Sequence, residues 1–529
     1  MSPSEPHLKP SDELTDDFSR SSRLVRNGVF LISIELGSKV LGLFFFVMLA
    51  RYLGARELGL YAYAGTLANL FVLLPKFGFE SLVQREVGRE KGTAWEYFRL
   101  ISMLKLILSL TALLALALVL FLVLPRAERF VVLLVGCFVF SYSFLEYVDS
   151  FFRALERSEF EVLVRLWFSL LNLAVGVYLL AAGWGLSTVV LGQLVCVLSA
   201  LVLAMAVLRR IACVPCQPRG GMGAVFRNNV SGASGSLPAE NWAGCMTAGL
   251  GNGFREYLIK AAPFAGIVTA LYFSNQMGIL MLSFFADKTS VGYLSAGLRL
   301  FDNLTLIPAA VMGAFLPVVS RYYRTSIGAF TTTLRFTVKY LFILSAPLAV
   351  GMYCLAPQLT VSLFGESFLP TASVFKILSL ALIFSFWNYL GDNMLIARNR
   401  EKRLLQLTWL GALIHITANL LLIPLFGYLG AGLATLATQL LYFIVLFRFI
   451  RRYLSIAGLI RLIWGPSLAA ATMGASVLWL QDLYLGVVVP IGIVVYMLIL
   501  LISKTITAGE LASFKEIWRF RRMKTGIVG

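Results

Sequence analysis

Long apolar runs recur along the whole chain, and they limit its fold more than any other feature of the sequence. An α-helix needs about 20 consecutive apolar residues to cross the hydrocarbon core of a bilayer. By that rule the sequence predicts about 14 membrane-spanning helices, joined mostly by short connections. The expected spans cover residues 28–50, 59–75, 99–124, 130–152, 162–182, 186–208, 257–284, 290–317, 335–356, 372–396, 405–427, 430–450, 458–480 and 484–503.

The composition favours an all-α polytopic membrane protein over a soluble one. Of the 529 residues, 59% are hydrophobic and only 14% are charged, whereas a soluble chain normally carries about a quarter charged residues. The first apolar run follows a polar segment and is too long for the core of a cleavable signal peptide. We therefore expect it to be the first span.

Lysine and arginine concentrate in alternate connections, and this pattern predicts the orientation of the chain. They occur before span 1, between spans 2 and 3, between spans 10 and 11, between spans 12 and 13, and after span 14. Positively charged loops stay on the cytoplasmic side, so both termini are expected to be cytoplasmic in a multi-pass protein of the plasma (inner) membrane. The net charge of +18 is then mainly a topology signal, and nucleic acid is not an expected partner.

Two polar segments lie outside the expected spans. Residues 213–256 are rich in Gly, Asn and Ser and predict a flexible cytoplasmic linker. This segment holds three cysteines, but zinc usually takes four ligands and no histidine is near, so no metal site is expected. In the basic tail, residues 504–529, apolar side chains from Leu511 to Trp518 fall on one helical face. That pattern predicts an amphipathic helix on anionic membrane lipids, with a disordered basic tail as the alternative.

Several polar side chains lie deep inside the apolar runs. A charge at the bilayer centre costs at least ~2.5 kcal/mol, so such residues tend to face a protein interior or a water-filled path. The candidate cavity residues are Glu35 and Lys39 in span 1, Asn275 and Gln276 in span 7, Arg299, Asp302 and Asn303 in span 8, and Asn388, Asp392 and Asn393 in span 10. Span 11 adds His415 and Asn419, whereas Glu146, Asp149 and Arg153 end span 4 near the cytoplasmic interface. A shared polar cavity explains this distribution, although pairs such as Arg299 and Asp302 could instead be structural ion pairs.

Two stretches resemble a known family. Residues 50–86 contain Ala50-Arg51, Gly54, Gly59 with Tyr61, Phe77-Gly78 and Arg85-Glu86. Residues 258–321 contain LIKAAPF, VGYLSAGLRL and IPAAVMGAFLPVVSR. Both are similar to polysaccharide-biosynthesis flippases of the multidrug/oligosaccharidyl-lipid/polysaccharide (MOP) exporter superfamily. Gly59 and Gly292 each open a span after a short polar turn, which favours a parallel repeat of two six-span units.

The resemblance implies two six-helix lobes around a central cavity, with two extra C-terminal helices beside it. The expected division is a tail (1–27), a first lobe (28–212), the linker (213–256), a second lobe (257–452), helices 13 and 14 (453–503) and the basic tail (504–529).

Span 7 departs from the family pattern. Relatives often carry Asn-Gln-x-Asp there, but here Gly278 takes the place of the carboxylate. The ion-coupling role of that carboxylate therefore does not carry over, although Asp302 or Asp392 could replace it.

The expected function is that of a flippase for a polyprenyl-diphosphate-linked oligosaccharide. Lys39 and Arg299 would attract the diphosphate and the amides would bind sugars. Flipping needs no covalent chemistry and no cofactor, only alternating access with a proton, sodium or membrane-potential gradient. Other polysaccharide-assembly proteins are further candidate partners.

Two other functional classes remain open. A multidrug exporter of the same superfamily would need an acidic, aromatic cavity. A membrane-bound polymerase or transferase is disfavoured, because the chain shows no nucleophile–base constellation and its only histidines are His7 and His415. The sequence therefore predicts no enzyme activity.

Overall fold

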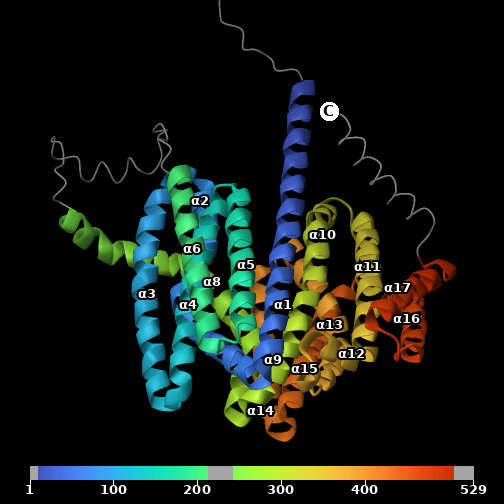
Figure 1. Cartoon of the computed structure of the whole chain (residues 1–529). Coiled ribbons are helices and arrows are strands. Elements are labelled where there is room, and N and C mark those ends of the chain that lie inside the picture. Colours follow the sequence, from blue (N-terminus) through green and yellow to red (C-terminus); the bar gives the residue numbers. More distant parts are fainter. Residues whose placement is uncertain (1–9, 213–241, 506–529) are drawn as a thin grey trace, which may run out of the picture. The chain divides into compact units, whose positions relative to one another are not determined.

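The computed structural model describes residues 10–212 and 242–505, and all regular secondary structure in these ranges is helical (Figure 1). Side chains are described from Gly37 to Ile211 and from Tyr257 to Thr505, apart from a few isolated positions. The chain divides into two compact units. Unit 1 comprises Met1–Phe45 and Leu67–Thr269, and unit 2 comprises Phe46–Thr66 and Ala270–Gly529.

Unit 1 is built around helix α4. Its helices are α2 (Phe79–Arg89), α3 (Ala94–Val123), α4 (Arg126–Ala154), α5 (Ser158–Ala181) and α6 (Leu186–Ala212), with the outer parts of α1 (Pro10–Lys76) and the first part of α8 (Trp242–Phe285). Helix α4 contacts α2, α3, α5 and α6. In its core, Phe98 stacks on Tyr147 and Phe151 meets both rings edge-on, and the Tyr147 hydroxyl donates to the Phe98 carbonyl at 3.1 Å. The buried phenol thereby keeps a hydrogen-bond partner.

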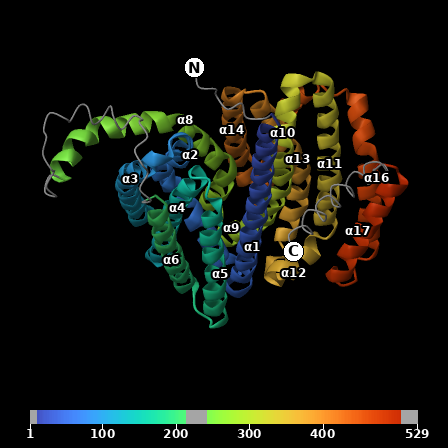
Figure 2. The same ribbon diagram turned by 90° about the horizontal axis from the view of Figure 1, so that it is seen from above.

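Unit 2 is built around helix α13. Its helices are α9 (Lys288–Leu304), α10 (Leu306–Thr325), α11 (Ile327–Cys354), α12 (Ala356–Phe364), α13 (Thr371–Ala397), α14 (Glu401–Phe426), α15 (Tyr428–Ile450), α16 (Ile456–Trp479) and α17 (Leu485–Ile502). Helix α13 contacts α9, α10, α11, α12 and α15. Figures 1 and 2 show α16 and α17 side by side next to α11, where Ala469, Met473 and Tyr496 form a separate core cluster.

Every expected span has a helical counterpart. In the described residues, 12 helical segments are long and apolar enough to cross a membrane. The first of these holds the first two expected spans, which are separated by a kink in α1 at Gly54, where φ is 78°. Only glycine adopts such a conformation readily. The expected span 290–317 is instead two helices, α9 and α10, because the chain breaks at Thr305.

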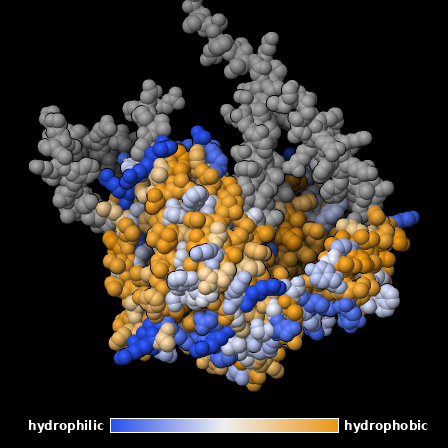
Figure 3. All heavy atoms as spheres, viewed as in Figure 1, coloured by the Kyte–Doolittle hydropathy of each residue, from blue (hydrophilic) through white to orange (hydrophobic). Residues whose placement is uncertain are grey.

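The outward surfaces of the helices are apolar, as a lipid environment requires. On α3, Leu110, Leu114, Leu118 and Phe121 recur at helical spacing and are all at least 60% exposed. Figure 3 shows mostly apolar residues on the face of unit 1 that it presents, with hydrophilic residues gathered towards the helix ends. Patches of this size rarely face water in soluble proteins. The chain is therefore a multi-pass membrane protein.

Two boundaries differ from the sequence predictions, and two short helices were not predicted. Helix α1 already begins at Pro10, inside the expected polar tail, since proline suits the first turn of a helix and acidic residues follow it. Helix α8 begins at Trp242, so the last part of the expected linker is helical. The short helices α2 and α12 were not predicted because neither is long enough for a span. The expected amphipathic tail, the cysteine cluster's Cys213 and Cys216, and most of the linker lie outside the described residues.

Candidate functional site

A polar cavity lies inside unit 2 among α8, α9, α14 and α15. The volume of the cavity is about 40 Å³. Its lining residues are Ser274, Asn275, Gly278, Leu294, Leu298, Phe301, Asp302, His415, Ala431, Thr435, Thr438 and Gln439. Three of the predicted polar residues, Asn275, Asp302 and His415, thus meet in one cavity. That is a site of few charges and many hydrogen-bonding groups, which suits hydroxyl-rich or neutral polar ligands.

Helix α14 contributes one buried polar residue to the lining of this cavity, His415, and carries a second, Asn419, close to the lining residue Gly278. His415 is 4% exposed and Asn419 is fully buried. The Nδ1 atom of His415 lies 3.1 Å from the Thr438 hydroxyl oxygen, and the Asn419 amide nitrogen donates to the His415 carbonyl at 2.8 Å. The two residues are four apart, so they share one helix face. Their spacing was visible in the sequence. Thr438 and Gln439 were not predicted as cavity residues, because the sequence of α15 is that of an ordinary apolar helix.

Arg299 and Asp302 lie on α9 just before the break at Thr305. Both side chains are exposed, and among the described residues no salt bridge joins them. The Arg299 guanidinium instead lies over the Phe46 ring, 5.3 Å from its centroid, in a cation–π contact. The sequence left a structural ion pair between these two residues open as an alternative, and no such pair joins them here. Asn303 donates its side-chain amide to the Arg299 carbonyl at 2.7 Å, which satisfies a backbone acceptor near the helix end.

The predicted residues of span 10 hold α13 against its neighbours. Asn388 donates to the side-chain oxygen of Gln439 at 2.7 Å, and the Tyr442 hydroxyl donates to Asp392 at 2.8 Å. Asn393 bonds only within its own helix, to the carbonyl of Tyr389. None of the three lines the cavity of unit 2. Helix-to-helix bonds of this kind are each worth about 0.6 kcal/mol in a membrane, so a packing role accounts for Asn388 and Asp392.

The remaining predicted residues are more scattered. Gln276 lies beside the cavity on α8, where its side-chain oxygen accepts a 3.2 Å bond from the Thr66 hydroxyl. Lys39 is exposed on α1, and Glu35 lies on the same helix with its side chain outside the described residues. The structure therefore brings together Asn275 of span 7, Asp302 of span 8 and His415 of span 11, and it leaves the role of span 1 as a prediction.

The segment 46–66 of unit 2 explains several of the residues that carry the family resemblance. Arg51 donates to the carbonyls of Ser362 and Leu363 at the end of α12, where a cation complements the helix dipole. Gly59 and Gly292 lie where α1 and α9 cross. A Cβ atom at Gly59 would lie 2.8 Å from the backbone nitrogen of Gly292, so the backbones touch directly. Small residues permit such close crossings of membrane helices.

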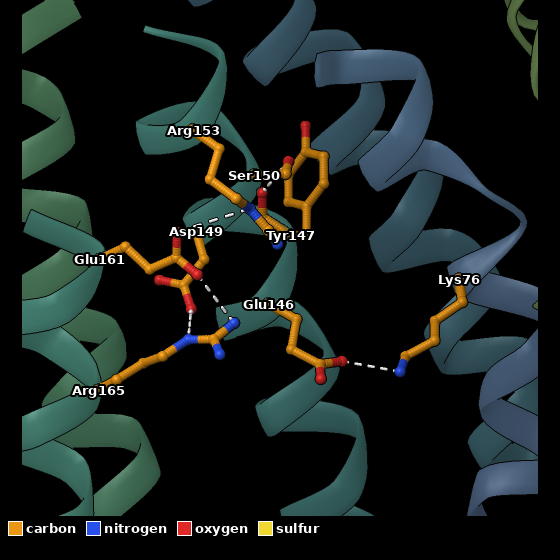
Figure 4. Close-up of polar contacts among 8 residues, drawn as sticks. All are labelled: Lys76, Glu146, Tyr147, Asp149, Ser150, Arg153, Glu161 and Arg165. Carbon is orange, nitrogen blue, oxygen red and sulfur yellow. Dashed lines mark hydrogen bonds and ion pairs between the residues drawn. The ribbon is translucent and has the colours of Figure 1, made fainter. Parts of the chain in front are cut away.

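A network of ion pairs lies inside unit 1, at the end of α4 (Figure 4). Arg165 contacts Asp149 and Glu161, each at 3.0 Å, and Arg153 approaches Glu161 at 3.6 Å. Asp149 is nearly fully buried, and one of its oxygens has no hydrogen-bond partner. Lys76 pairs separately with Glu146 at 2.7 Å. Buried charges persist only when paired in this way.

Sequence reasoning found only part of this network. It identified the three charged residues of span 4 but missed Glu161 and Arg165, although their separation by four residues on α5 is a usable signal. It also missed Lys105, which is fully buried on α3 and donates to the Ser143 hydroxyl at 3.1 Å. Among the described residues, no group of three or more His, Cys, Asp or Glu side chains could hold a metal ion.

Comparison with known sequences places the chain in a family. The family described as "Polysaccharide biosynthesis protein" matches residues 24–323. This range is more than half of the chain, and the protein belongs to that family. An uncharacterized membrane protein of Methanocaldococcus jannaschii, MJ1068, is 27% identical over 178 residues, which cover 30% of this chain and 35% of the relative. The match thus spans about a third of that relative's length.

Two solved structures show the same fold. The lipid II flippase MurJ, in an inward closed conformation, aligns over 89% of this chain and 98% of its own, with a TM-score of 0.69 and 16% identity. An inward-facing multidrug resistance MATE family transporter of the MOP superfamily aligns over 82% and 95%, with a TM-score of 0.52 and 16% identity. The chain therefore shares its fold with these two proteins, and the resemblance to the polysaccharide-biosynthesis family is confirmed. Family and fold together define a multi-pass membrane protein of this family.

Proposed function

We propose that the protein is a flippase that moves a polyprenyl-diphosphate-linked oligosaccharide from the cytoplasmic to the outer leaflet by alternating access. The family description points to polysaccharide biosynthesis, and the fold is shared with a protein named as a lipid II flippase. Such a substrate has an anionic head, many hydroxyl groups and a long apolar tail. Its translocation breaks no covalent bond, so the protein would need binding groups rather than a catalytic centre.

Arg299 is the observation that carries this proposal. It is an exposed cation in the middle of an apolar segment, held over an aromatic ring and not in a salt bridge with Asp302. A guanidinium at that depth is stable only beside water, protein or a polar ligand. Its planar fork matches the oxygens of a diphosphate. Asn275 and Gln439 line the adjoining cavity and offer amide groups to sugar hydroxyls.

Further parts of the proposal rest on charge distribution in the sequence. Both termini would lie in the cytoplasm and the protein in the plasma membrane, because the positively charged connections stay inside. The basic tail would contact anionic lipids. Lys39 would add a second cation for the diphosphate, and proteins that extend or ligate the flipped glycan would act on the outer side.

The proposal is tested with purified protein in liposomes that contain a fluorescent polyprenyl-diphosphate oligosaccharide. Because Arg299 is not in a salt bridge with Asp302, Arg299→Ala should leave the fold intact. It should lower the flipping rate about 10-fold or more, as expected for loss of a charged hydrogen bond. Arg335→Ala is the matched control, since Arg335 is also an exposed arginine on a membrane helix but lies away from the cavity. Equal rates for Arg299→Ala and wild type would refute the diphosphate-binding role.

Export of cationic drugs is the second candidate, because the exposed carboxylate of Asp302 lines the cavity. In that case Asp302→Asn would abolish drug efflux from intact cells, and Arg299→Ala would leave it unchanged or raise it. In a flippase, Arg299→Ala is the damaging variant. The two substitutions therefore separate the two functions in one pair of assays.

A further inference from the structure

We propose that the basic end of unit 2, where α10 and α13 end, holds a binding site for the phosphate group of an anionic membrane phospholipid. Arg398, Tyr323 and Tyr453 would supply its hydrogen-bond donors. None of the three lines the cavity of unit 2, so this site is separate from that cavity, and its existence does not depend on the proposed function.

The Arg398 side chain is a half-buried cation with too few acceptors. Arg398 directly follows the last residue of α13. Its Nε atom donates to the Tyr323 hydroxyl at 3.3 Å, which is longer than the about 2.7–3.2 Å of most such bonds. Its Nη1 atom is buried without a hydrogen-bond partner, and no carboxylate in the described ranges forms an ion pair with it. A buried donor without an acceptor is uncommon and indicates a missing partner.

Rings from three separate segments hold the guanidinium in place. It lies 5.5 Å from the ring centroid of Tyr323 on α10 and 5.7 Å from that of Tyr453, which follows α15. Phe330 of α11 packs against both tyrosines, with ring centroids 5.4 Å from Tyr323 and 5.0 Å from Tyr453. The two cation–π contacts position the charge, but they provide no acceptor for its N–H groups.

The two tyrosines add further donors to the same site. The Tyr323 oxygen accepts the bond from Arg398, so its own hydrogen remains available. In the part of the chain that the structure describes, neither phenol hydroxyl donates to an acceptor, although the hydroxyl of a buried tyrosine usually finds a partner. Nη1 and two hydroxyl groups thus gather around one cation. Phosphate oxygens accept several hydrogen bonds and match the planar fork of arginine.

Negative charge is scarce at this end of unit 2. The sequence has no Asp or Glu in residues 303–365 or 402–481. The only acidic residue in the turn between α13 and α14 is Glu401, which is exposed. The neighbouring segments therefore add positive charge and offer Arg398 no buried counter-charge, so a ligand would have to bring it. Exposed arginines lie within two residues of the site: Arg321, Arg400, Arg451 and Arg452.

The equivalent end of unit 1 carries its own counter-charges. The turns after α4 and α13 have the same form, because Glu156 and Asn399 both adopt positive φ angles, 59° and 53°. In each turn the next backbone nitrogen donates to the carbonyl five residues earlier. Five positions beyond Glu156 stands Glu161, which pairs with arginines, but five positions beyond Asn399 stands Leu404. Unit 1 therefore neutralises its arginines internally, whereas unit 2 leaves Arg398 without a carboxylate.

The surroundings favour a phosphate on a lipid over a soluble one. Ile327, three residues before Phe330, is 61% exposed, and Ile456, three residues after Tyr453, is 60% exposed. Apolar surface beside clustered cations suits a molecule with a charged head and apolar tails. In the orientation proposed above, this end faces the cytoplasmic leaflet, whose anionic lipids attract basic segments. The dipole of α13 also favours a cation at Arg398, but it leaves Nη1 without an acceptor.

The first test measures lipid binding to the full-length protein in detergent by native mass spectrometry, with phosphatidylglycerol as the anionic phospholipid. Arg398→Gln should weaken binding of the tightest lipid about 10-fold or more, as expected for loss of a charged hydrogen bond. Arg403→Gln is the matched control, since Arg403 is an exposed arginine in the first turn of α14 that also lies over a ring, that of Phe449. It should change the affinity little. Equal affinities for the two variants would overturn the proposal.

A second substitution removes a donor and keeps the ring. Tyr323→Phe preserves the cation–π contact, so the unfolding temperature of the lipid-free protein should stay the same, whereas lipid affinity should fall about 2- to 10-fold. A tyrosine that acted only through its ring would leave the affinity unchanged. Tyr322→Phe is the control, because Tyr322 is the adjacent tyrosine and its ring lies beside Arg321. Equal affinities for Tyr323→Phe and Tyr322→Phe would refute the three-donor site, even if Arg398→Gln failed to fold.

Competing ligands separate a lipid phosphate from other phosphates. Phosphatidylcholine has a phosphate but no net negative charge and should bind more weakly than phosphatidylglycerol. Inorganic phosphate at millimolar concentration should not displace phosphatidylglycerol, and displacement would make a soluble anion the ligand. Binding of a polyprenyl diphosphate without binding of phosphatidylglycerol would assign the site to a transport substrate. Either of the last two results would overturn the proposal.

Hydrogen–deuterium exchange then locates the bound lipid. Phosphatidylglycerol should slow exchange in the peptides that contain Tyr323, Arg398 and Tyr453 in the wild-type protein, because the lipid would join three segments that are distant in sequence. The effect should be lost in Arg398→Gln and kept in Arg403→Gln. Protection that falls only on other parts of the chain would show that the lipid binds elsewhere and would overturn the proposal.

Discussion

The ion-pair network of unit 1 gives a sharp prediction for Arg165→Leu. Arg165 is the shared partner of Asp149 and Glu161, whose side chains are only 2% and 8% exposed, and it is itself 26% exposed. Its removal leaves Asp149 without a salt-bridge partner, because Arg153 approaches only Glu161. Breaking a buried pair from one side costs about 3–5 kcal/mol. At roughly 2–4 °C per kcal/mol for a domain of this size, the unfolding temperature should fall by about 10 °C.

The control for this prediction is an ion pair of the same residue types at the surface. Arg157 and Glu159 are 59% and 50% exposed, and such pairs contribute about 0–1 kcal/mol. Arg157→Leu should therefore shift the unfolding temperature by no more than a few degrees. Thermal unfolding of both variants is followed by tryptophan fluorescence in the same detergent.

A double variant identifies the cause of the loss. If the cost arises from the stranded carboxylate, Arg165→Leu/Asp149→Asn should recover much of the stability that Arg165→Leu loses, because an amide carries no charge. Equal unfolding temperatures for Arg165→Leu and Arg157→Leu would refute the reasoning. A double variant no more stable than Arg165→Leu would show that the guanidinium matters through packing instead.

Three further predictions follow from the fold and the charge pattern. Gly292→Ala should destabilise the protein by about 1–3 kcal/mol, because the new methyl group would overlap the Ala55 carbonyl. The control is Gly266→Ala, whose added carbon meets nothing within 4 Å, and the unfolding temperatures of the two variants measure the difference. Reporter fusions after Gly529 and within residues 213–241 should both give cytoplasmic signals, and an external signal from either would contradict the orientation. Deletion of most of residues 213–241 should leave the yield of folded membrane protein unchanged, whereas a loss of monodisperse protein would show that this segment packs as structure.

The membrane helices were predictable because the signal for each is local. An apolar run such as 372–396 reads directly as α13, which extends from Thr371 to Ala397. The break at Thr305 was not predictable, since Leu306 and Pro308 continue the apolar run and proline is tolerated in the first turn of a helix. Short helices outside the bilayer, such as α12, leave no comparable run.

The sequence predicted which types of residue form the candidate site, but it did not predict which residues contact one another. Charges and amides in apolar runs were conspicuous, and the structure places Asn275 and Asp302 in one cavity. Their depth, however, carried no information about contacts between helices. The bond between Asn388 and Gln439 joins residues 51 positions apart, and Arg299 meets a ring on a helix that lies far earlier in the chain. Such pairs depend on how helices pack, which periodicity within one helix does not encode.

The close crossing of α1 and α9 also constrains the evolution of two distant positions. A side chain at Gly59 would overlap the backbone carbonyl of Lys288, and a side chain at Gly292 would overlap that of Ala55. Because each obstacle is backbone, no side-chain substitution elsewhere can remove it. Among related sequences, each of the two positions should keep glycine independently of the other, and a larger residue at either one is expected only where the helices have moved apart.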